Sequence, residues 1–84
     1  MKSINIVKSY ELIPNDSHKS FYGKARVYVL ADGTEILRSY QTDVLARDPD
    51  GTLHRLWDGW SATTGRHIKA FAGINKAEYL ALPV

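Results

Sequence analysis

Residues 57–73 constrain the fold of this chain more than any other stretch, because they carry both the start and the stop signals of one helix. Ser61 is a residue type that often caps a helix N-terminus, where its oxygen accepts from backbone N–H groups of the first turn. An apolar stripe follows at helical spacing, formed by Ile68, Phe71 and Ala72. Gly73 supplies the left-handed residue that commonly ends a helix. The sequence therefore predicts a helix over about residues 62–72.

The length and composition indicate one small globular domain. The chain has 84 residues, of which 44% are hydrophobic and 24% are charged, as in ordinary folded domains and unlike disordered tails. A chain of this length has room for a single modest core, so we expect residues 1–84 to form one domain. The formal net charge of +2, from 11 basic and 9 acidic residues, is too small to indicate nucleic-acid binding by itself.

Two absences in the sequence narrow the function classes further. There is no cysteine, which excludes disulfides, zinc–thiolate sites and thiol catalysis. The N-terminus lacks the apolar segment of a signal peptide, and no apolar run reaches membrane-spanning length. We therefore expect a cytoplasmic protein with no membrane partner.

Turn residues divide the first two thirds of the chain into β-rich runs. Pro14 ends the first run, and Asp32-Gly33 is a two-residue turn of the type that favours a β-hairpin. Asp48-Pro49-Asp50-Gly51 makes the next turn, because proline fixes φ at its second position and glycine takes the left-handed one. The runs are residues 4–13, 21–31, 34–46 and 52–57.

The turn at Asp32-Gly33 predicts a strand register. A two-residue turn pairs Ala31 with Thr34. Further pairs then fall on one face: Val29 with Ile36, Ala25 with Tyr40, Gly23 with Thr42 and Phe21 with Val44. Arg38, opposite Val27, is the one break in the apolar pattern of this face. Because strands alternate faces, a shift of one residue would move the whole set to the other face.

A short second helix is expected after Asn75. Asn75 and Glu78 have the spacing of a capping box, Ile74 and Tyr79 have that of a hydrophobic staple, and Pro83 follows the end. The predicted fold class is α+β, an antiparallel three- or four-stranded meander with a C-terminal helix and a short second helix packed on one face. The expected core consists of Phe21, Ala25, Val27, Val29, Ile36, Tyr40, Val44, Leu56, Ile68 and Phe71.

The other face of the predicted hairpin combines aromatic rings with cations. One strand contributes Tyr22, Lys24, Arg26 and Tyr28, and the next contributes Leu37, Ser39, Gln41 and Asp43. Continued alternation would add Arg47, Arg55 and Trp57. Rings that stack on bases and cations that meet phosphates are typical of platforms for single-stranded nucleic acids. A solvated sheet face or a self-association surface explains the same residues, and no RNA-recognition motif accompanies them. The candidate binding residues on this face are Tyr22, Lys24, Arg26, Tyr28, Arg55 and Trp57.

The start of the predicted helix is the second candidate site. Unpaired backbone donors and the positive end of the helix dipole lie beside several polar side chains, and such a helix start can hold an anion. These side chains are Ser61, Thr63, Thr64, Arg66 and His67. The simpler interpretation is a capped helix in which Thr63 and His67, one turn apart, share a hydrogen bond. No nucleophile elbow or oxyanion motif is present, and no two of the three histidines have metal-ligand spacing. We therefore predict no catalytic residue, metal or cofactor.

Two runs of the chain resemble a family of small uncharacterised proteins. They are Ser39-Tyr40-Gln41-Thr42-Asp43-Val44 and Trp60-Ser61-Ala62-Thr63-Thr64-Gly65-Arg66-His67-Ile68, and the similarity covers residues 37–71. The family members carry S-Y-x-T-x-V, then a tryptophan or tyrosine followed by S-A-T-T-x-x-H-I, and they occur in phages and bacteria. The resemblance implies a domain of unknown function, a phage or mobile-element origin and no particular activity. The shared pattern suits a helix packed on a sheet, and Arg66 and His67 are the residues that packing explains least.

Two function classes fit these observations. The first is a small non-enzymatic interaction module that uses its open basic-aromatic sheet face to contact a nucleic acid or a protein. The second is a small anion-binding or enzymatic domain centred on the helix start from Ser61 to His67. In both cases we expect a monomer or a weak homodimer.

Overall fold

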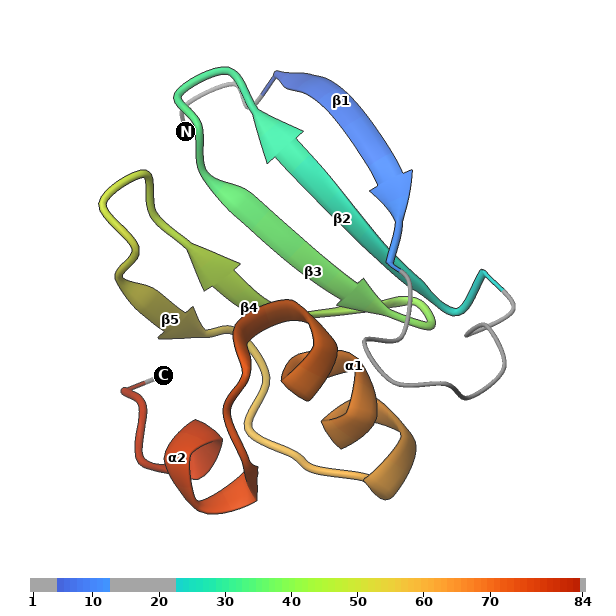
Figure 1. The fold of residues 1–84 in the computed structure, drawn as a ribbon, viewed down its shortest axis with the longest axis vertical. Helices are drawn as coiled ribbons and strands as arrows, with labels where there is room; N and C mark the ends of the chain where they lie inside the picture. Colours follow the sequence, from blue (N-terminus) through green and yellow to red (C-terminus); the bar gives the residue numbers. More distant parts are fainter. Residues whose placement is uncertain (1–4, 13–22, 84) are drawn as a thin grey trace.

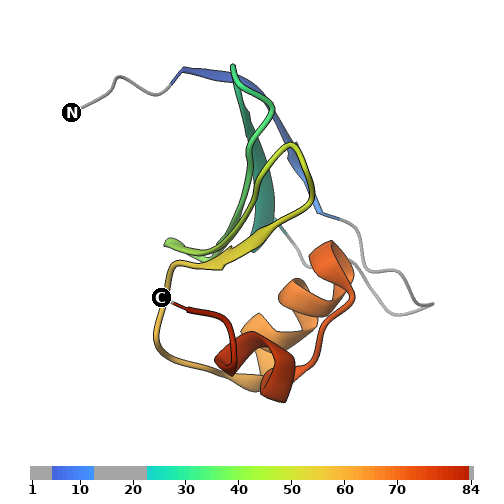
Figure 2. The ribbon, with the colours of Figure 1, turned by 90° about the vertical axis from the view of Figure 1, so that its left-hand side faces the viewer.

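The computed structural model describes residues 5–12 and 23–83, and this part of the chain forms an antiparallel sheet with two helices on one side (Figures 1 and 2). The strands follow one another in space in chain order: β1 Ile6–Glu11, β2 Ala25–Leu30, β3 Glu35–Ser39, β4 Thr42–Arg47 and β5 Leu53–Arg55. The helices are α1 Ala62–Ala72 and α2 Lys76–Leu80. The α+β class is confirmed, but the sheet has five strands rather than three or four. Neither described helix is long and apolar enough to cross a membrane.

The sheet has two unlike faces, which we call inner and outer. Figure 2 shows that the sheet curves and that both helices lie against its concave side, the inner face. The helices cover the part of the inner face near the ends of β3 and β4, as Figure 1 shows from the helix side. The outer face is the opposite, convex side.

Both helix starts form as predicted, because their caps are encoded locally. The Ser61 side chain accepts a hydrogen bond from the backbone N–H of Thr64 at 3.1 Å, and Gly73 ends α1 with φ 74°. At α2, Asn75 and Glu78 form the expected capping box, in which each side chain accepts from the other residue's backbone N–H.

The predicted register of the first hairpin is wrong by one residue. The backbone N–H of Leu30 donates to the carbonyl of Thr34 at 2.8 Å, and that of Gly33 donates to the carbonyl of Leu30 at 3.0 Å. The loop therefore contains three residues, Ala31 to Gly33, with Gly33 at φ 93°. The Asp32 carboxylate accepts from the backbone N–H of Thr34 at 2.9 Å and supports this longer turn.

The shift turns β3 over. Val27 now pairs with Leu37, and Ala25 pairs with Ser39, so Leu37 and Ser39 lie on the inner face. Ile36 and Arg38 move to the outer face, opposite Tyr28 and Arg26 respectively. In the predicted register Arg38 was the one charged residue on an apolar face. In the observed register it lies on the outer face, where its guanidinium forms an ion pair with Asp43 at 3.0 Å.

A second turn divides the predicted run 34–46 into two strands. β3 and β4 are joined by Tyr40 and Gln41, and Tyr40 has φ 57°, in the left-handed region that bulky residues seldom adopt. The backbone N–H of Tyr40 donates to the carbonyl of Lys24 at 2.6 Å, which holds the turn against the start of β2. As a result the Tyr40 side chain is 51% exposed and does not belong to the core.

The core fills the space between the inner face and the helices. It consists of Leu12, Ala25, Val27, Leu37, Val44, Leu45, Ile68, Phe71 and Tyr79. Ala25, Val27, Val44, Ile68 and Phe71 are buried as predicted, whereas Val29 and Ile36 are only half-buried and Leu56 is exposed. Phe21 lies outside the described residues. The largest core residues that the sequence interpretation missed are Leu37, Leu45 and Tyr79. Leu37 and Leu45 were missed because the predicted register placed the odd-numbered residues of the run 34–46 on the outer face.

Two close packing features fix the C-terminal third of the chain. The Trp60 ring lies across Gly65 of α1, so closely that a Cβ at this position would meet Trp60 Cζ2 at 2.3 Å. The hydroxyl of Tyr79 donates toward the carbonyls of Val44 and Trp57, at 2.8 and 2.7 Å. Burial raises the pKa of the Tyr79 hydroxyl, which keeps it protonated as a donor.

Candidate functional site

A buried polar cluster joins β3 to α1. Ser39 Oγ lies 2.9 Å from Thr64 Oγ1 and 2.8 Å from His67 Nδ1, both within hydrogen-bonding distance. The three residues are only 2%, 4% and 1% exposed, respectively. Burial, with a smaller contribution from the neighbouring Arg66 cation, lowers the pKa of the His67 imidazole below its ordinary value of 6.5. We call these three residues the polar cluster.

The polar cluster was missed by the sequence interpretation because the wrong register placed Ser39 on the outer face. His67 Nδ1 lies within hydrogen-bonding distance of Ser39 Oγ, a contact that the sequence interpretation did not predict, and Thr63 is exposed. The signal that could have identified the cluster was the Ser39 that begins the first run of the family resemblance.

The polar cluster is suited to positioning α1 rather than to attack on a substrate. A serine oxygen within hydrogen-bonding distance of an imidazole is the arrangement of a nucleophile and its general base. However, the near-complete burial of Ser39 closes its hydroxyl to a substrate in this conformation. Among the described residues no buried side-chain nitrogen or oxygen lacks a hydrogen-bond partner, so the cluster is satisfied within the fold.

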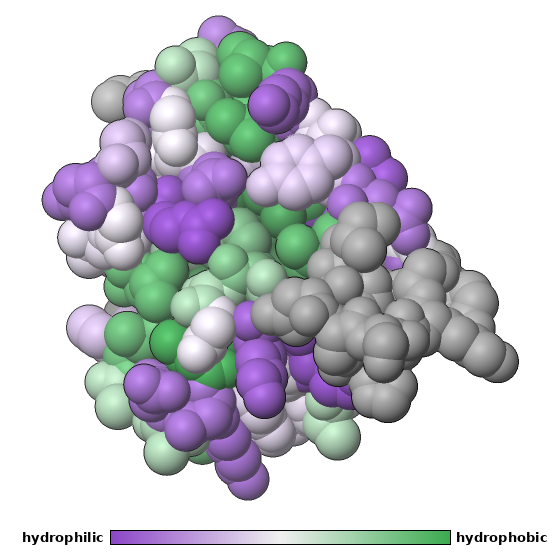
Figure 3. All heavy atoms as spheres, in the orientation of Figure 1, coloured by the Kyte–Doolittle hydropathy of each residue, from purple (hydrophilic) through white to green (hydrophobic). Residues whose placement is uncertain are grey.

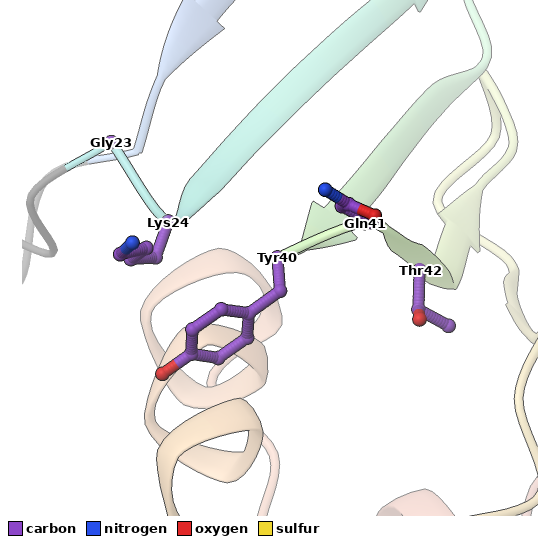
Figure 4. A pocket seen from close by; sticks show the side chains of 5 residues that line it. All are labelled: Gly23, Lys24, Tyr40, Gln41 and Thr42. Atoms are coloured by element: carbon purple, nitrogen blue, oxygen red, sulfur yellow. The ribbon is translucent and has the colours of Figure 1, made fainter.

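A hollow of about 440 Å³ opens beside Tyr40, near the polar cluster (Figure 4). It is lined by Gly23, Lys24, Tyr40, Gln41 and Thr42. The Tyr40 ring lies 5.8 Å from the His67 ring, and the Lys24 ammonium lies 5.9 Å from the Tyr40 ring centre. Figure 4 shows Lys24 and Tyr40 pointing the same way alongside α1, whereas Gln41 turns away from them. The polar groups of this hollow therefore do not converge on one point.

The five candidate residues at the start of α1 do not surround a common point either. Thr64 and His67 turn into the polar cluster, whereas Ser61, Thr63 and Arg66 are exposed. The Ser61 side chain and carbonyl accept from the backbone N–H groups of Thr64 and Gly65. The first turn of α1 is thus capped by its own chain. Within the described residues, no group of three or more His, Asp or Glu side chains could hold a metal ion.

The six candidate residues on the predicted sheet face are distributed over different parts of the molecule. Arg26 and Tyr28 lie on the outer face, and Lys24 lies beside Tyr40 at the end of the sheet. Arg55 lies on the inner face instead, where its guanidinium donates to the carbonyl of Leu82 and lies 5.7 Å from the Tyr79 ring centre. Trp57 packs against the core, and Tyr22 lies outside the described residues. Arg47, expected to extend this face, stacks on Phe71 of α1.

A row of four charged residues crosses the outer face. The paired positions Glu11, Arg26, Arg38 and Asp43 come from four neighbouring strands. Arg38 forms an ion pair with Asp43, and Arg26 donates to Ser9 Oγ at 3.3 Å. The row therefore holds two cations and two carboxylates, and its formal charges cancel.

An apolar hollow lies next to this charged row. It has a volume of about 250 Å³ and is lined by Ile6, Tyr28, Leu30, Ile36, Arg38 and Asp43. The Arg38 guanidinium lies 5.8 Å from the Tyr28 ring centre, within the range of a cation–π contact. We call this feature the outer hollow. Its floor is apolar and aromatic, and its border is polar.

Comparison with known families gives one match. Residues 7–80 match a family of unknown function, DUF8033, and this span contains all five strands from the second residue of β1 onward and both helices. Comparison with curated proteins and with solved structures found no match. Because the match extends over most of the 84 residues, the chain belongs to this family of unknown function.

Proposed function

We propose that this protein is a non-enzymatic interaction module that binds a protein partner through the outer hollow. The observation that carries the proposal is the combination of an apolar, tyrosine-containing depression with a polar border, on a sheet face that the described helices leave uncovered. Such a combination suits the anchor side chain of a protein partner, because burial of apolar and aromatic groups dominates protein recognition.

The charges of the outer face favour a protein over a nucleic acid. Nucleic-acid platforms present unbalanced positive charge to phosphates. Here the two arginines share their row with two carboxylates, and Arg38 is already paired with Asp43. The platform expected from the sequence is also reduced, since Arg55 and Trp57 face the helices.

The proposal is tested by site-specific crosslinking from the outer hollow. A photoreactive residue in place of Ile36, at the floor of the hollow, should form an adduct with one protein partner in cells that carry this chain. The matched control replaces Lys69, an exposed residue of α1, with the same photoreactive group. The adduct should appear only with the Ile36 probe, should resist nuclease and should disappear when Tyr28→Ala removes the aromatic wall.

Two outcomes would overturn the proposal. One is an equal pattern of adducts from Ile36 and Lys69, which would show that the outer hollow has no selectivity. The other is binding of single-stranded oligonucleotides that weakens with salt and is abolished by the double change Lys24→Glu and Arg26→Glu. In that case the logarithmic salt slope should be about 0.7 per phosphate neutralised.

The proposal keeps two further expectations from the sequence. A cytoplasmic location would give the module access to an intracellular partner, and a phage or mobile-element origin would make a host protein the natural candidate. The first is checked by fractionating cells that produce the chain, and the second by the genes that neighbour its family members.

A further inference from the structure

The β1 strand forms an edge of the sheet whose outer side no described strand pairs with (Figure 1). Five of its six residues are exposed, and three of the six large hydrophobic side chains that are exposed in the described part of the chain belong to it. These are Ile6, Val7 and Tyr10, at 56%, 62% and 38% exposure. Figure 3 shows hydrophobic atoms at the top of the molecule, where β1 begins, and mainly polar atoms farther along the strand. An exposed edge strand presents unpaired N–H and C=O groups and can serve as a template for pairing with another strand.

The backbone of β1 has a defined set of groups available for pairing. The N–H of Leu12 donates to the carbonyl of Ala25 across the β1–β2 ladder at 2.9 Å. Residues of an antiparallel ladder alternate between bonding to the neighbouring strand and pointing away from it. Tyr10 and Lys8 therefore bond toward β2, and Ser9 and Glu11 direct their N–H and C=O groups away from the sheet.

We propose that β1 pairs antiparallel with β1 of a second copy of this chain, about a two-fold axis at Tyr10. This register brings the outward-pointing backbone groups of Ser9 in one copy opposite those of Glu11 in the other, twice by symmetry. It also places the two Tyr10 rings side by side on the inner face, and aromatic pairs between strands are stabilising. The irregularity between Ile6 and Lys8 falls outside the paired segment.

Charge complementarity is what points to a second copy as the occupant. Ser9 and Glu11 lie on the outer face, opposite Tyr28 and Arg26 of β2. The Arg26 guanidinium already reaches Ser9 Oγ at 3.3 Å. The Glu11 carboxylate accepts from the backbone N–H of Gly23 in its own chain through Oε2 at 2.8 Å. Its Oε1, placed opposite Ser9 of the second copy, would meet both the Ser9 hydroxyl and the Arg26 cation of that copy. The two-fold axis repeats this contact between Glu11 of the second copy and Ser9 of the first. The β1 strand is therefore complementary to itself.

Pairing in this way would also join the two outer faces. Residues directly opposite each other in a sheet point to the same side, so the outer hollows of both copies would open on one continuous surface. The inference concerns the edge of β1 and does not depend on the proposed function of the hollow. Its test uses the isolated chain, without any other partner.

Sedimentation over a range of protein concentrations is the first measurement. The weight-average mass should rise from the monomer value of 9.5 kDa toward twice that value. Ser9→Pro removes an outward N–H without removing a β1–β2 hydrogen bond, whereas Ser9→Ala keeps it. Loss of two intermolecular hydrogen bonds should lower the association constant of Ser9→Pro by about tenfold or more, with Ser9→Ala close to wild type.

Charge exchange tests the register without relying on proline. Glu11→Arg should weaken the dimer, and Glu11→Arg combined with Arg26→Glu should restore it. Crosslinking adds a direct distance, since the chain has no other thiol. Tyr10→Cys should form a disulfide-linked dimer under mild oxidation, because residues opposite each other lie about 4.5 Å apart at Cα. Lys8→Cys is the control, because the two Lys8 positions are offset by roughly 13 Å along the strands.

The inference is overturned if the wild-type chain stays monomeric up to millimolar concentration. It is also overturned if Ser9→Pro, folded as judged by circular dichroism, associates like Ser9→Ala, or if Lys8→Cys crosslinks as readily as Tyr10→Cys. Failure of the charge exchange to restore association would contradict the two-fold axis at Tyr10.

Discussion

Replacement of Gly65 by alanine should destabilise the wild-type protein but stabilise a variant that lacks the Trp60 ring. This change in the sign of the effect on the free energy of unfolding is the sharpest test of how α1 packs. Taken alone, glycine in a helix interior is less stable than alanine by about 0.5–1 kcal/mol. Gly65→Ala would therefore stabilise the protein if only helix propensity mattered. The structure argues against this, because the added Cβ would lie 2.3 Å from Cζ2 and 2.8 Å from Cη2 of Trp60.

The Trp60 ring has little freedom to move away from an added methyl group. It is half-buried, packs against the core and lies 5.7 Å from the Tyr79 ring. Overpacking of this kind costs about 1–3 kcal/mol, which exceeds the gain in propensity. We therefore expect Gly65→Ala to destabilise the wild-type protein by about 1–2 kcal/mol, and to stabilise a Trp60→Ala background by up to about 1 kcal/mol.

A double-mutant cycle measures both effects. The four proteins are unfolded in urea and followed by far-ultraviolet circular dichroism, which does not depend on Trp60 fluorescence. The coupling free energy between the two sites, which is the difference between these two effects, should be about 1–3 kcal/mol, above the additivity error of a cycle of about 0.3–0.5 kcal/mol. Gly65→Ala acting with the same sign in both backgrounds would refute the argument that Trp60 is what demands glycine here.

Three further predictions concern the polar cluster and its surroundings. Ser39→Ala should cost about 2–4 kcal/mol in unfolding free energy, because it leaves two buried polar groups without a shared partner, and Thr64→Val added to it should recover part of the loss. His67 has a lowered pKa in the fold, so the unfolded state binds a proton first as pH falls; stability should be complete above about pH 6.5 and decline below it by at most about 1.4 kcal/mol per pH unit. His67→Gln should flatten this decline, and an unchanged decline in that variant would assign the effect to other groups. Tyr40→Gly should relieve about 1 kcal/mol of left-handed backbone strain and should lose the ring contact with His67. Because the two effects oppose each other, the melting temperature should change by no more than a few degrees, and a larger change in either direction would contradict this balance.

The helices were predictable from the sequence because their boundaries depend on neighbouring residues alone. Ser61 and Gly73 bound α1, and Asn75 with Glu78 starts α2, without help from the rest of the fold. The sheet register was not predictable in the same way. Asp32-Gly33 suits both a two-residue turn and a three-residue loop ending in a left-handed glycine, and tertiary packing chose the second.

The sequence nevertheless contained a clue to the error. Arg38 was the one charged residue on an otherwise apolar face, and in the observed register it lies on the outer face beside Asp43. The division between β3 and β4 left no such clue, since Tyr40 and Gln41 are not typical turn residues. The register error placed Ser39 on the outer face, which explains why the polar cluster could be found only in the structure.

The hydrogen bonds of the Tyr79 hydroxyl affect the order in which the elements of the fold assemble. The sheet joins strands that are neighbours in sequence, so most of it can assemble through short loops. A helix as short as α2 is not stable by itself in water, and Tyr79 fixes it to carbonyls 35 and 22 residues earlier in the chain. We expect α2 to dock late and to open before the sheet does, with amide hydrogens that exchange faster than those of β2 and β3. A nascent chain that has not yet produced Tyr79 would expose the core beneath α2, so synthesis of the α2 segment decides when this part of the chain becomes resistant to proteolysis.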